Sequence, residues 1–317
     1  MSPRTALPLL LLLLLAAFGA SAGTAVELAR EAMGGNPISK QKLEALAESG
    51  DTLAQHYMGQ LYLSGRAVPR SDERAAEWFR RAADRGDVAS AHNLGVIHER
   101  ATGALRDRAE ALKWYRSAAE RGFARSQANL GYLLWRDKDP EARMWIEKAA
   151  AQKEPRGLYL LGMLELEAGR DAQAATTLGE AAGKNDRDAQ YQLALLYGAG
   201  RGTGKDEKRA MDWLRKSAAQ HQPEAQYLLA AAYSRGLYGV RRDDAAAAEW
   251  LRRSARQGNV EAQYALANAY AEGRGVPRDP NEALGWIQLA ARNHHPGAAA
   301  ALERIQAMLK PPEAAKP

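Results

Sequence analysis

The sequence predicts an all-α protein, a right-handed α-solenoid of about seven helix-turn-helix repeats. Two observations carry this prediction. Tryptophan recurs at intervals of about 36 residues, and a short Ala-Gln motif recurs ahead of it at a similar interval. The recurring tryptophans are Trp78, Trp114, Trp145, Trp213, Trp250 and Trp286. Such a fixed period is typical of repeat proteins, in which stacked units share one continuous core.

The chain begins with a basic residue, an apolar run and a group of small residues. Arg4 precedes the apolar residues 6–18, and the small residues 20–22 follow. This order predicts a secretory signal peptide over residues 1–22, cleaved near Ala22. The apolar run is shorter than the ~20 residues that a membrane span needs, which makes an uncleaved anchor the weaker alternative. We expect an exported protein, periplasmic or secreted, with no transmembrane segment in the mature chain.

Composition narrows the function classes. The 317 residues include 44 Lys and Arg against 38 Asp and Glu, a formal net charge of +6. Because the charges are mixed along the chain, this excess favours solubility and weak attraction to acidic partners over nucleic-acid binding. Cysteine is absent, so disulfides and thiolate metal sites are excluded. An exported protein without disulfides must be stabilised by burial, which requires a sizeable core.

Half-units are predicted at both ends of the array. Within the N-terminal segment 23–49, residues 39–49 resemble a second helix without its first. Residues 294–309 resemble a first helix without its second. Such helices would cap the exposed ends of the stack. The tail at 310–317 is predicted to be disordered.

Residues 50–293 form the predicted array of seven repeats, each made of two helices. The first helix carries a large apolar residue, a small residue and an aromatic residue, as in Leu193, Ala194 and Tyr197. These spacings keep all three on one helix face. Glycine weakens a helix interior by about 1 kcal/mol, so its recurrence at the small position indicates close approach of the partner helix. The glycines at this position are Gly59, Gly95, Gly131 and Gly162.

The second helix is predicted to begin at a capping residue seven positions before the tryptophan position. Ser and Asp are strong N-caps because their side chains accept the free N–H groups of the first turn. In the fourth repeat, Leu178 takes the tryptophan position. Repeats three and four have tight turns where the others have a glycine-containing loop. The predicted caps are Ser71, Asp107, Asp171, Asp206, Asp243 and Asp279.

The last repeat shows the pattern most completely. Residues 258–293 contain Ala-Gln-Tyr-Ala-Leu-Ala, then Gly-Arg-Gly-Val-Pro-Arg-Asp, then Trp and Ala-Ala. This pattern resembles the Sel1-like repeat, a longer relative of the tetratricopeptide repeat, over roughly residues 50–293. The resemblance implies first helices that line an extended concave surface. It also implies an adaptor or scaffold for protein–protein interaction in the bacterial cell envelope.

Catalytic and ligand-binding motifs are weak. The loop at 198–205 resembles a phosphate-binding loop, but Ala199 and Asp206 stand where that motif needs Gly and Ser or Thr. His56 and His92 share one position in adjacent repeats, yet two imidazoles fall short of the usual three or four metal ligands. No serine-nucleophile motif occurs. We therefore predict no enzyme activity, no cofactor and no metal.

The candidate partner-binding residues lie on the inward side of the first helices. Tyrosine recurs there, and tyrosine gives a large, rigid and amphipathic contact area that is common at interfaces. With the acidic and amide side chains beside it, this column is predicted to bind a protein, such as an extended peptide segment. Filling of gaps between helices is the alternative role. The residues are Tyr159, Tyr191, Tyr227, Tyr264, Asn268, Glu224 and Glu261.

Two other function classes remain open at this point. Peptidoglycan or another glycan is the alternative ligand, bound through the aromatic and arginine-rich groove. An enzyme is the third and weakest hypothesis, because no catalytic motif supports it. We expect a monomer that binds no nucleic acid.

Overall fold

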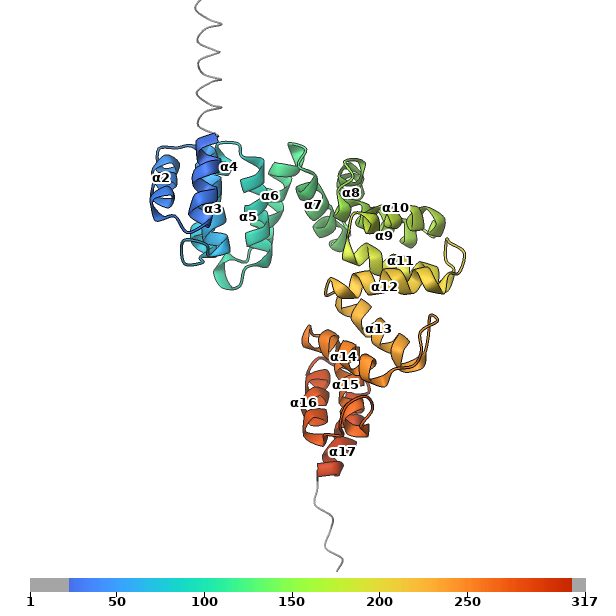
Figure 1. Ribbon diagram of the computed structural model, residues 1–317. Helices are drawn as coiled ribbons and strands as arrows, with labels where there is room; N and C mark the ends of the chain where they lie inside the picture. Colours follow the sequence, from blue (N-terminus) through green and yellow to red (C-terminus); the bar gives the residue numbers. More distant parts are fainter. Residues whose placement is uncertain (1–22, 310–317) are drawn as a thin grey trace, which may run out of the picture. The chain divides into compact units, whose positions relative to one another are not determined.

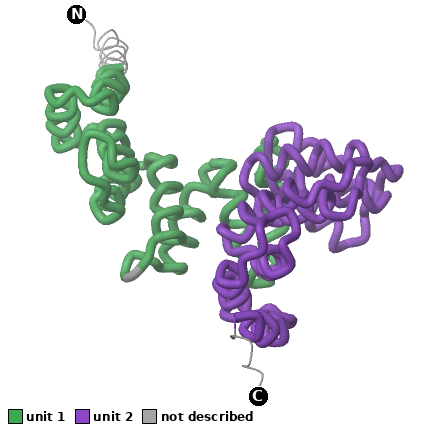
Figure 2. The backbone as a smooth tube through the Cα atoms, turned by 60° about the horizontal axis from the view of Figure 1, so that its bottom comes forward, with its two compact units in different colours: residues 1–157 green, residues 158–317 purple. Residues whose placement is uncertain are grey.

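The structure is a computed structural model that describes residues 23–309 (Figure 1). The predicted signal peptide and the predicted tail lie outside these residues. Within them the chain is helical and contains no strand, which confirms the all-α solenoid fold. The chain divides into two compact units, Met1–Gly157 and Leu158–Pro317, called unit 1 and unit 2 below and coloured separately in Figure 2.

Seven first helices alternate with seven second helices, each of 13 residues except α8, which has 10. We number the repeats from one to seven. The pairs are α3 (Thr52–Ser64) and α4 (Asp72–Asp84), α5 (Val88–Arg100) and α6 (Arg108–Glu120), α7 (Ala124–Arg136) and α8 (Ala142–Ala151), α9 (Pro155–Glu167) and α10 (Asp171–Gly183), α11 (Arg187–Ala199) and α12 (Glu207–Ala219), α13 (Pro223–Arg235) and α14 (Asp244–Arg256), and α15 (Val260–Glu272) and α16 (Pro280–Arg292).

Further helices lie at both ends of the described chain. At the N-terminal side, α2 (Pro37–Glu48) packs against α3, and residues 23–33 are helical as well, which the repeat pattern did not indicate. Ala25 and Ala29 of this segment are buried in the same core cluster as Leu43 of α2. At the C-terminal side, α17 (Ala298–Leu309) packs against α16.

The glycines of the first helices mark the closest helix contacts. A Cβ atom added to Gly59 would lie 2.6 Å from the Phe79 ring, and one added to Gly95 would lie 2.5 Å from the Tyr115 ring. Real Cβ atoms do not approach other heavy atoms so closely, so each glycine makes room for a large side chain of the second helix. The same arrangement holds for Gly131 with Ile146 and for Gly162 with Leu178. The tight packing predicted from these glycines is confirmed.

Five of the six predicted second-helix caps accept hydrogen bonds from first-turn N–H groups: Ser71, Asp107, Asp206, Asp243 and Asp279. The prediction for Asp171 is wrong. Asp171 is the first residue of α10, and Arg170 occupies the cap position. The side chain of Arg170 makes no capping hydrogen bond. The carboxylate of Asp171 instead accepts two hydrogen bonds from Arg201, at 2.7 and 3.0 Å.

This correction shifts the fourth repeat by one residue. Seven positions after the Arg170 cap stands Thr177, so Thr177 takes the tryptophan position. Leu178 therefore corresponds to Phe79 and Tyr115, the residues that follow tryptophan in repeats one and two. Its contact with Gly162 fits that position, because the equivalent glycines contact the equivalent large residues.

Buried glutamines join neighbouring repeats. In five repeats the glutamine of the first helix donates its side-chain N–H to a carbonyl eight residues earlier, near the end of the preceding second helix. Because a buried side-chain amide without an acceptor is costly, these bonds stabilise each repeat boundary. The pairs are Gln55 with Ala47, Gln127 with Ala119, Gln190 with Ala182, Gln226 with Ala218, and Gln263 with Ala255.

Two inter-helix loops require glycine for a second reason. Gly275 has φ +71°, and a Cβ on it would lie 1.8 Å from the backbone oxygen of Asp244 in the preceding repeat. Gly202, in the loop that resembles a phosphate-binding motif, has φ +66° and would place a Cβ 2.1 Å from the backbone oxygen of Asp171. These glycines let the loop touch the backbone of the preceding second helix. The inter-helix turn is therefore the correct interpretation of that loop.

Candidate partner-binding site

All seven predicted binding residues lie on first helices, and four of them line one pocket in unit 2. The pocket has a volume of about 450 Å³ and is lined by α13, α14 and α15. Tyr227 belongs to α13, and Glu261, Tyr264 and Asn268 belong to α15. Tyr159 and Tyr191 lie on α9 and α11, and Glu224 lies on α13, outside the pocket lining.

The floor of the pocket consists of small apolar side chains. Ala230 of α13, Ala247 and Ala248 of α14, and Ala269 of α15 are each at most 5 % exposed. Small side chains at these positions leave space above them, with Tyr227 and Tyr264 as half-buried walls. An apolar floor between amphipathic walls suits the side chains of a bound polypeptide.

Charged groups lie at the rim of the pocket, and the sequence pattern did not indicate them as site residues. Arg242 pairs with Asp244 at 2.8 Å, and Arg274 pairs with Glu272 at 2.8 Å. Arg235, at the end of α13, is exposed and forms no ion pair within the described part of the chain. The signal that could have found these arginines is their place beside the helix-ending glycine or the capping aspartate. The guanidinium groups at this rim can donate hydrogen bonds to a carboxylate or to a peptide carbonyl of a partner.

The tyrosines of the column face acidic residues of the following repeat. Burial raises the pKa of the Tyr191 hydroxyl, and the negative charge of Glu224 raises it further. Burial and the charge of Glu261 act in the same way on the pKa of Tyr227. Both hydroxyls therefore stay protonated at neutral pH and can donate hydrogen bonds to a partner.

The last repeat differs because the C-terminal cap contacts its tyrosine. His295 stacks on Tyr264, with ring centroids 4.0 Å apart and planes 13° from parallel. Asn268 is 8 % exposed, and its side-chain oxygen accepts a hydrogen bond from Arg304 of α17. Tyr264 is thus held rigid on one face, and Asn268 is already engaged.

A scan against protein families matches the Sel1 repeat at residues 52–87, 88–123, 124–154, 187–221, 223–259 and 260–295. These segments cover more than half of the sequence. The chain belongs to the Sel1 repeat family. The fourth helix pair is unmatched. It also departs furthest from the pattern of the other repeats, with Gly157 and Leu158 in place of the Ala-Gln pair and Thr177 in place of the tryptophan.

Two solved Sel1-type structures are similar over most of this chain. A Sel1 repeat protein from Oxalobacter formigenes is 30% identical, with 90% of this chain and 87% of that chain aligned and a TM-score of 0.64. The protective antigen c5321 of uropathogenic Escherichia coli is also 30% identical, with 92% and 66% aligned and a TM-score of 0.61. This chain spans about two thirds of c5321. No curated protein matches the sequence.

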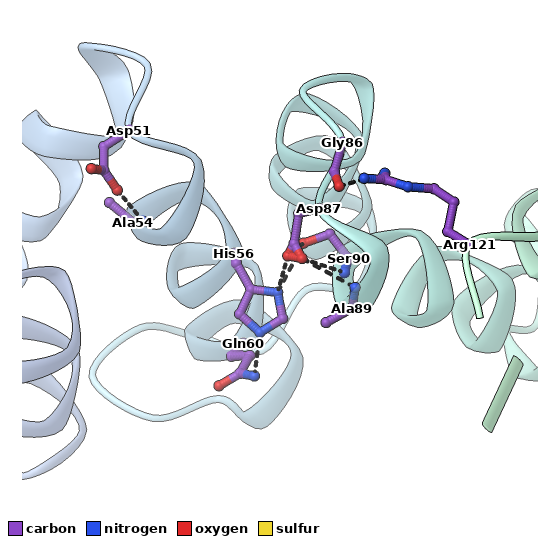
Figure 3. Close-up of polar contacts among 9 residues, drawn as sticks. All are labelled: Asp51, Ala54, His56, Gln60, Gly86, Asp87, Ala89, Ser90 and Arg121. Carbon is purple, nitrogen blue, oxygen red and sulfur yellow. Dashed lines mark hydrogen bonds and ion pairs between the residues drawn. The ribbon is translucent and has the colours of Figure 1, made fainter. Parts of the chain in front are cut away.

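In repeats one and two of this Sel1 repeat protein, the tyrosine position holds histidines with a structural role, and Figure 3 shows the first of them, His56. His56 is 7 % exposed, and its Nδ1 lies 2.8 Å from the Ser90 hydroxyl and 3.5 Å from Asp87. The side-chain amide of Gln60 lies 2.7 Å from Nε2 and donates to it. Burial lowers the pKa of His56, against the opposing effect of Asp87. The ring therefore links α3 to α5 as a neutral donor.

His92 makes the same kind of link between the next two first helices, α5 and α7. Its Nδ1 lies 2.9 Å from the hydroxyl of Ser126 on α7. Burial and the positive charges of Arg125, Arg100 and Arg156 lower its pKa to about 4. Each histidine thus contacts the next first helix through serine. Residues 23–309 contain no group of three or more His, Asp or Glu side chains placed to hold a metal ion.

In the part of the chain that the structure describes, no helix combines the length and apolar character of a bilayer span. Sel1 repeats generally mediate protein interactions, and proteins built from them are generally non-enzymatic scaffolds.

Proposed function

We propose that this protein is an exported adaptor that binds a partner protein through the pocket between α13 and α15. One observation carries the proposal. Two half-buried tyrosines, Tyr227 and Tyr264, stand over an alanine floor, and the exposed guanidinium of Arg235 at the rim has no ion-pair partner among the described residues. Rigid aromatic walls, an apolar floor and a free cation are the features of a polypeptide-binding pocket.

The fit favours an extended segment over a folded surface. First helices of successive repeats lie side by side, so a chain that crosses α13 and α15 would meet similar side chains at each step. Small apolar side chains of the segment would fill the space above Ala230 and Ala248, and its backbone would accept from the tyrosine hydroxyls. The proposed setting is the bacterial periplasm, reached by a signal peptide that ends near Ala22.

Site-specific photo-crosslinking tests the pocket. A photo-reactive residue at Ser234, which lines the pocket, should give a discrete protein adduct in cells. The same residue at the exposed Lys208 of α12 should give none. Tyr227→Ala together with Tyr264→Ala should abolish the adduct. Tyr197→Ala should preserve it, because Tyr197 is also a half-buried first-helix tyrosine but lies outside the pocket lining.

Two results would contradict the proposal. Equal adducts at Ser234 and Lys208 would show nonspecific proximity. Enrichment on purified peptidoglycan sacculi that needs the same two tyrosines, without any protein adduct, would make a glycan the ligand. Amino-terminal sequencing of the mature protein from a periplasmic fraction tests export, with residue 23 expected first.

A further inference from the structure

Four arginines of unit 1 lie near Tyr132, near His92 or near both. Tyr132 on α7 has the guanidinium of Arg156 at 4.8 Å and that of Arg136 at 5.8 Å from its ring centroid. Arg125 and Arg100 join Arg156 as the charges that act on His92. We define the arginine cluster as Arg100, Arg125, Arg136 and Arg156. It lies on α5, α7 and the start of α9, on first helices like the tyrosine column of unit 2.

The cluster is not neutralised within the described residues of unit 1. None of its four arginines forms an ion pair or a hydrogen bond with a carboxylate there, although most arginines of the second helices do, such as Arg116 with Glu141 and Arg81 with Glu48. The nearby Glu99 accepts a hydrogen bond from the hydroxyl of Tyr115 at 2.6 Å, and Asp137 pairs with Arg108 at 2.6 Å. Arg100, Arg125 and Arg136 are exposed, and Arg156 is half-buried.

We propose that the arginine cluster binds an acidic polypeptide segment of a partner protein. The planar guanidinium group binds carboxylates through two parallel hydrogen bonds, and the stacked Tyr132 ring holds Arg156 and Arg136 in place for this. His92 adds no charge, because it is neutral at neutral pH. The attraction therefore depends on arginine alone and persists across the physiological pH range.

The geometry disfavours nucleic acid at this surface. Binding of single strands depends on exposed aromatic rings on which bases stack. Tyr132 is only half-exposed, and two guanidinium groups of the cluster lie over its ring. Four arginines also provide few phosphate contacts compared with the six to ten, roughly, of a typical duplex-binding protein.

Fluorescence anisotropy with two labelled probes tests the proposal on the full chain. One probe is a short peptide of alternating Glu and Ser, and the other is a thymidine oligonucleotide of equal net charge. The peptide should bind, and added salt should weaken the binding because exposed charges are screened. Arg125→Gln with Arg156→Gln should weaken peptide binding roughly tenfold or more.

The matched control removes the same charge elsewhere. Arg80→Gln with Arg143→Gln changes exposed arginines of the second helices α4 and α8 and should leave peptide affinity within about twofold, as expected for charges away from the contact. An equal loss in both variants, no peptide binding, or tighter binding of the oligonucleotide would overturn the proposal. These outcomes do not depend on Tyr227 or Tyr264, so failure of the unit 2 pocket is distinguishable from failure here.

Discussion

Unit 1 and unit 2 use the same position of the first helix for opposite purposes. In unit 1, His56 and His92 are neutral rings that reach a serine of the next first helix and tie neighbouring repeats together. In unit 2, Tyr191 and Tyr227 keep part of their rings at the surface and face acidic residues. The same backbone position thus serves cohesion in one unit and presents a surface in the other.

The helix contacts differ in a parallel way. Unit 1 pairs glycine with a large side chain, as in Gly59 with Phe79 and Gly95 with Tyr115. In repeats five and seven, alanine shares a core cluster with a smaller partner, as in Ala194 with Leu214. Because protein interiors are close-packed, the rings of Phe79 and Tyr115 leave room only for glycine, whereas Leu214 leaves room for alanine. Glycine also faces the smaller Ile146 and Leu178, so the total volume at this contact differs among the repeats.

The inter-helix loops allow the strongest test of how the units differ. Gly275→Ala in repeat seven should destabilise the protein by about 3 to 4 kcal/mol, since the new Cβ would overlap the Asp244 backbone and adopt positive φ. The control is Ala67→Gly at the equivalent place in repeat one, where an exposed alanine already has φ +61°. This change should alter stability by less than about 1 kcal/mol. Urea unfolding measures both, and similar effects would refute the close loop contact.

The size pairing of the helices gives the next largest effect. Gly95→Ala should destabilise by about 2 kcal/mol, because the Tyr115 ring has no room to move away. Adding Tyr115→Leu recreates the alanine–leucine pair of repeat five. A double-mutant cycle should then show a favourable coupling of at least about 1 kcal/mol. Additive effects would mean that the two positions do not share one volume.

The loss of folding stability in acid should depend on His92 of unit 1, for which the tyrosines of unit 2 have no counterpart. The pKa of His92 is about 4 in the folded protein, against about 6.5 when unfolded. Between pH 6.5 and pH 4 the unfolded chain therefore binds more protons at this histidine than the folded protein does. The contribution of neutral His92 to folding stability is complete above pH 6.5 and is lost as the pH falls towards 4. Between pH 7 and 4.5, wild type should lose about 2 kcal/mol more than His92→Gln in urea unfolding. Identical pH dependence would show that His92 does not titrate in this way.

The smallest effect concerns the capping residues within unit 2. Asp243→Ala should destabilise by about 1 kcal/mol, because the first turn of α14 loses its side-chain acceptor. Asp171→Ala should cost less, since that carboxylate caps no helix and only pairs with the exposed Arg201. Thermal unfolding of the two variants ranks them, and the reverse order would restore Asp171 as a cap.

The fold was predictable because its signals are local and repeated. Caps such as Asp243, the small residues at the helix contact and the tryptophan period each follow from short-range chemistry that recurs in most repeats. The fourth repeat misled the prediction because its turn is short and its true cap, Arg170, has no capping side chain. Asp171, one residue later, therefore matched the expected cap pattern better than Arg170, which occupies the cap position.

The candidate site was predictable only in part. The recurrence of Tyr227 and Tyr264 placed both on the same side of first helices, and the structure brings them to one pocket. The burial of His56 and the engagement of Asn268 by Arg304 were not predictable, since each depends on a partner from another helix that no short motif specifies. The unpaired state of the arginine cluster likewise depends on which carboxylates other residues already occupy.

The glutamine bonds have a consequence for how the chain acquires its fold. Each glutamine reaches a carbonyl only eight residues upstream, yet the bond crosses a repeat boundary, as in Gln226 with Ala218. A boundary of this kind closes as soon as the first turns of the next helix have formed. Contacts so near in sequence form fast and cost little chain entropy. A chain that is synthesised from its N-terminus can therefore complete each repeat almost as it appears, with little unpaired helix end exposed to aggregation.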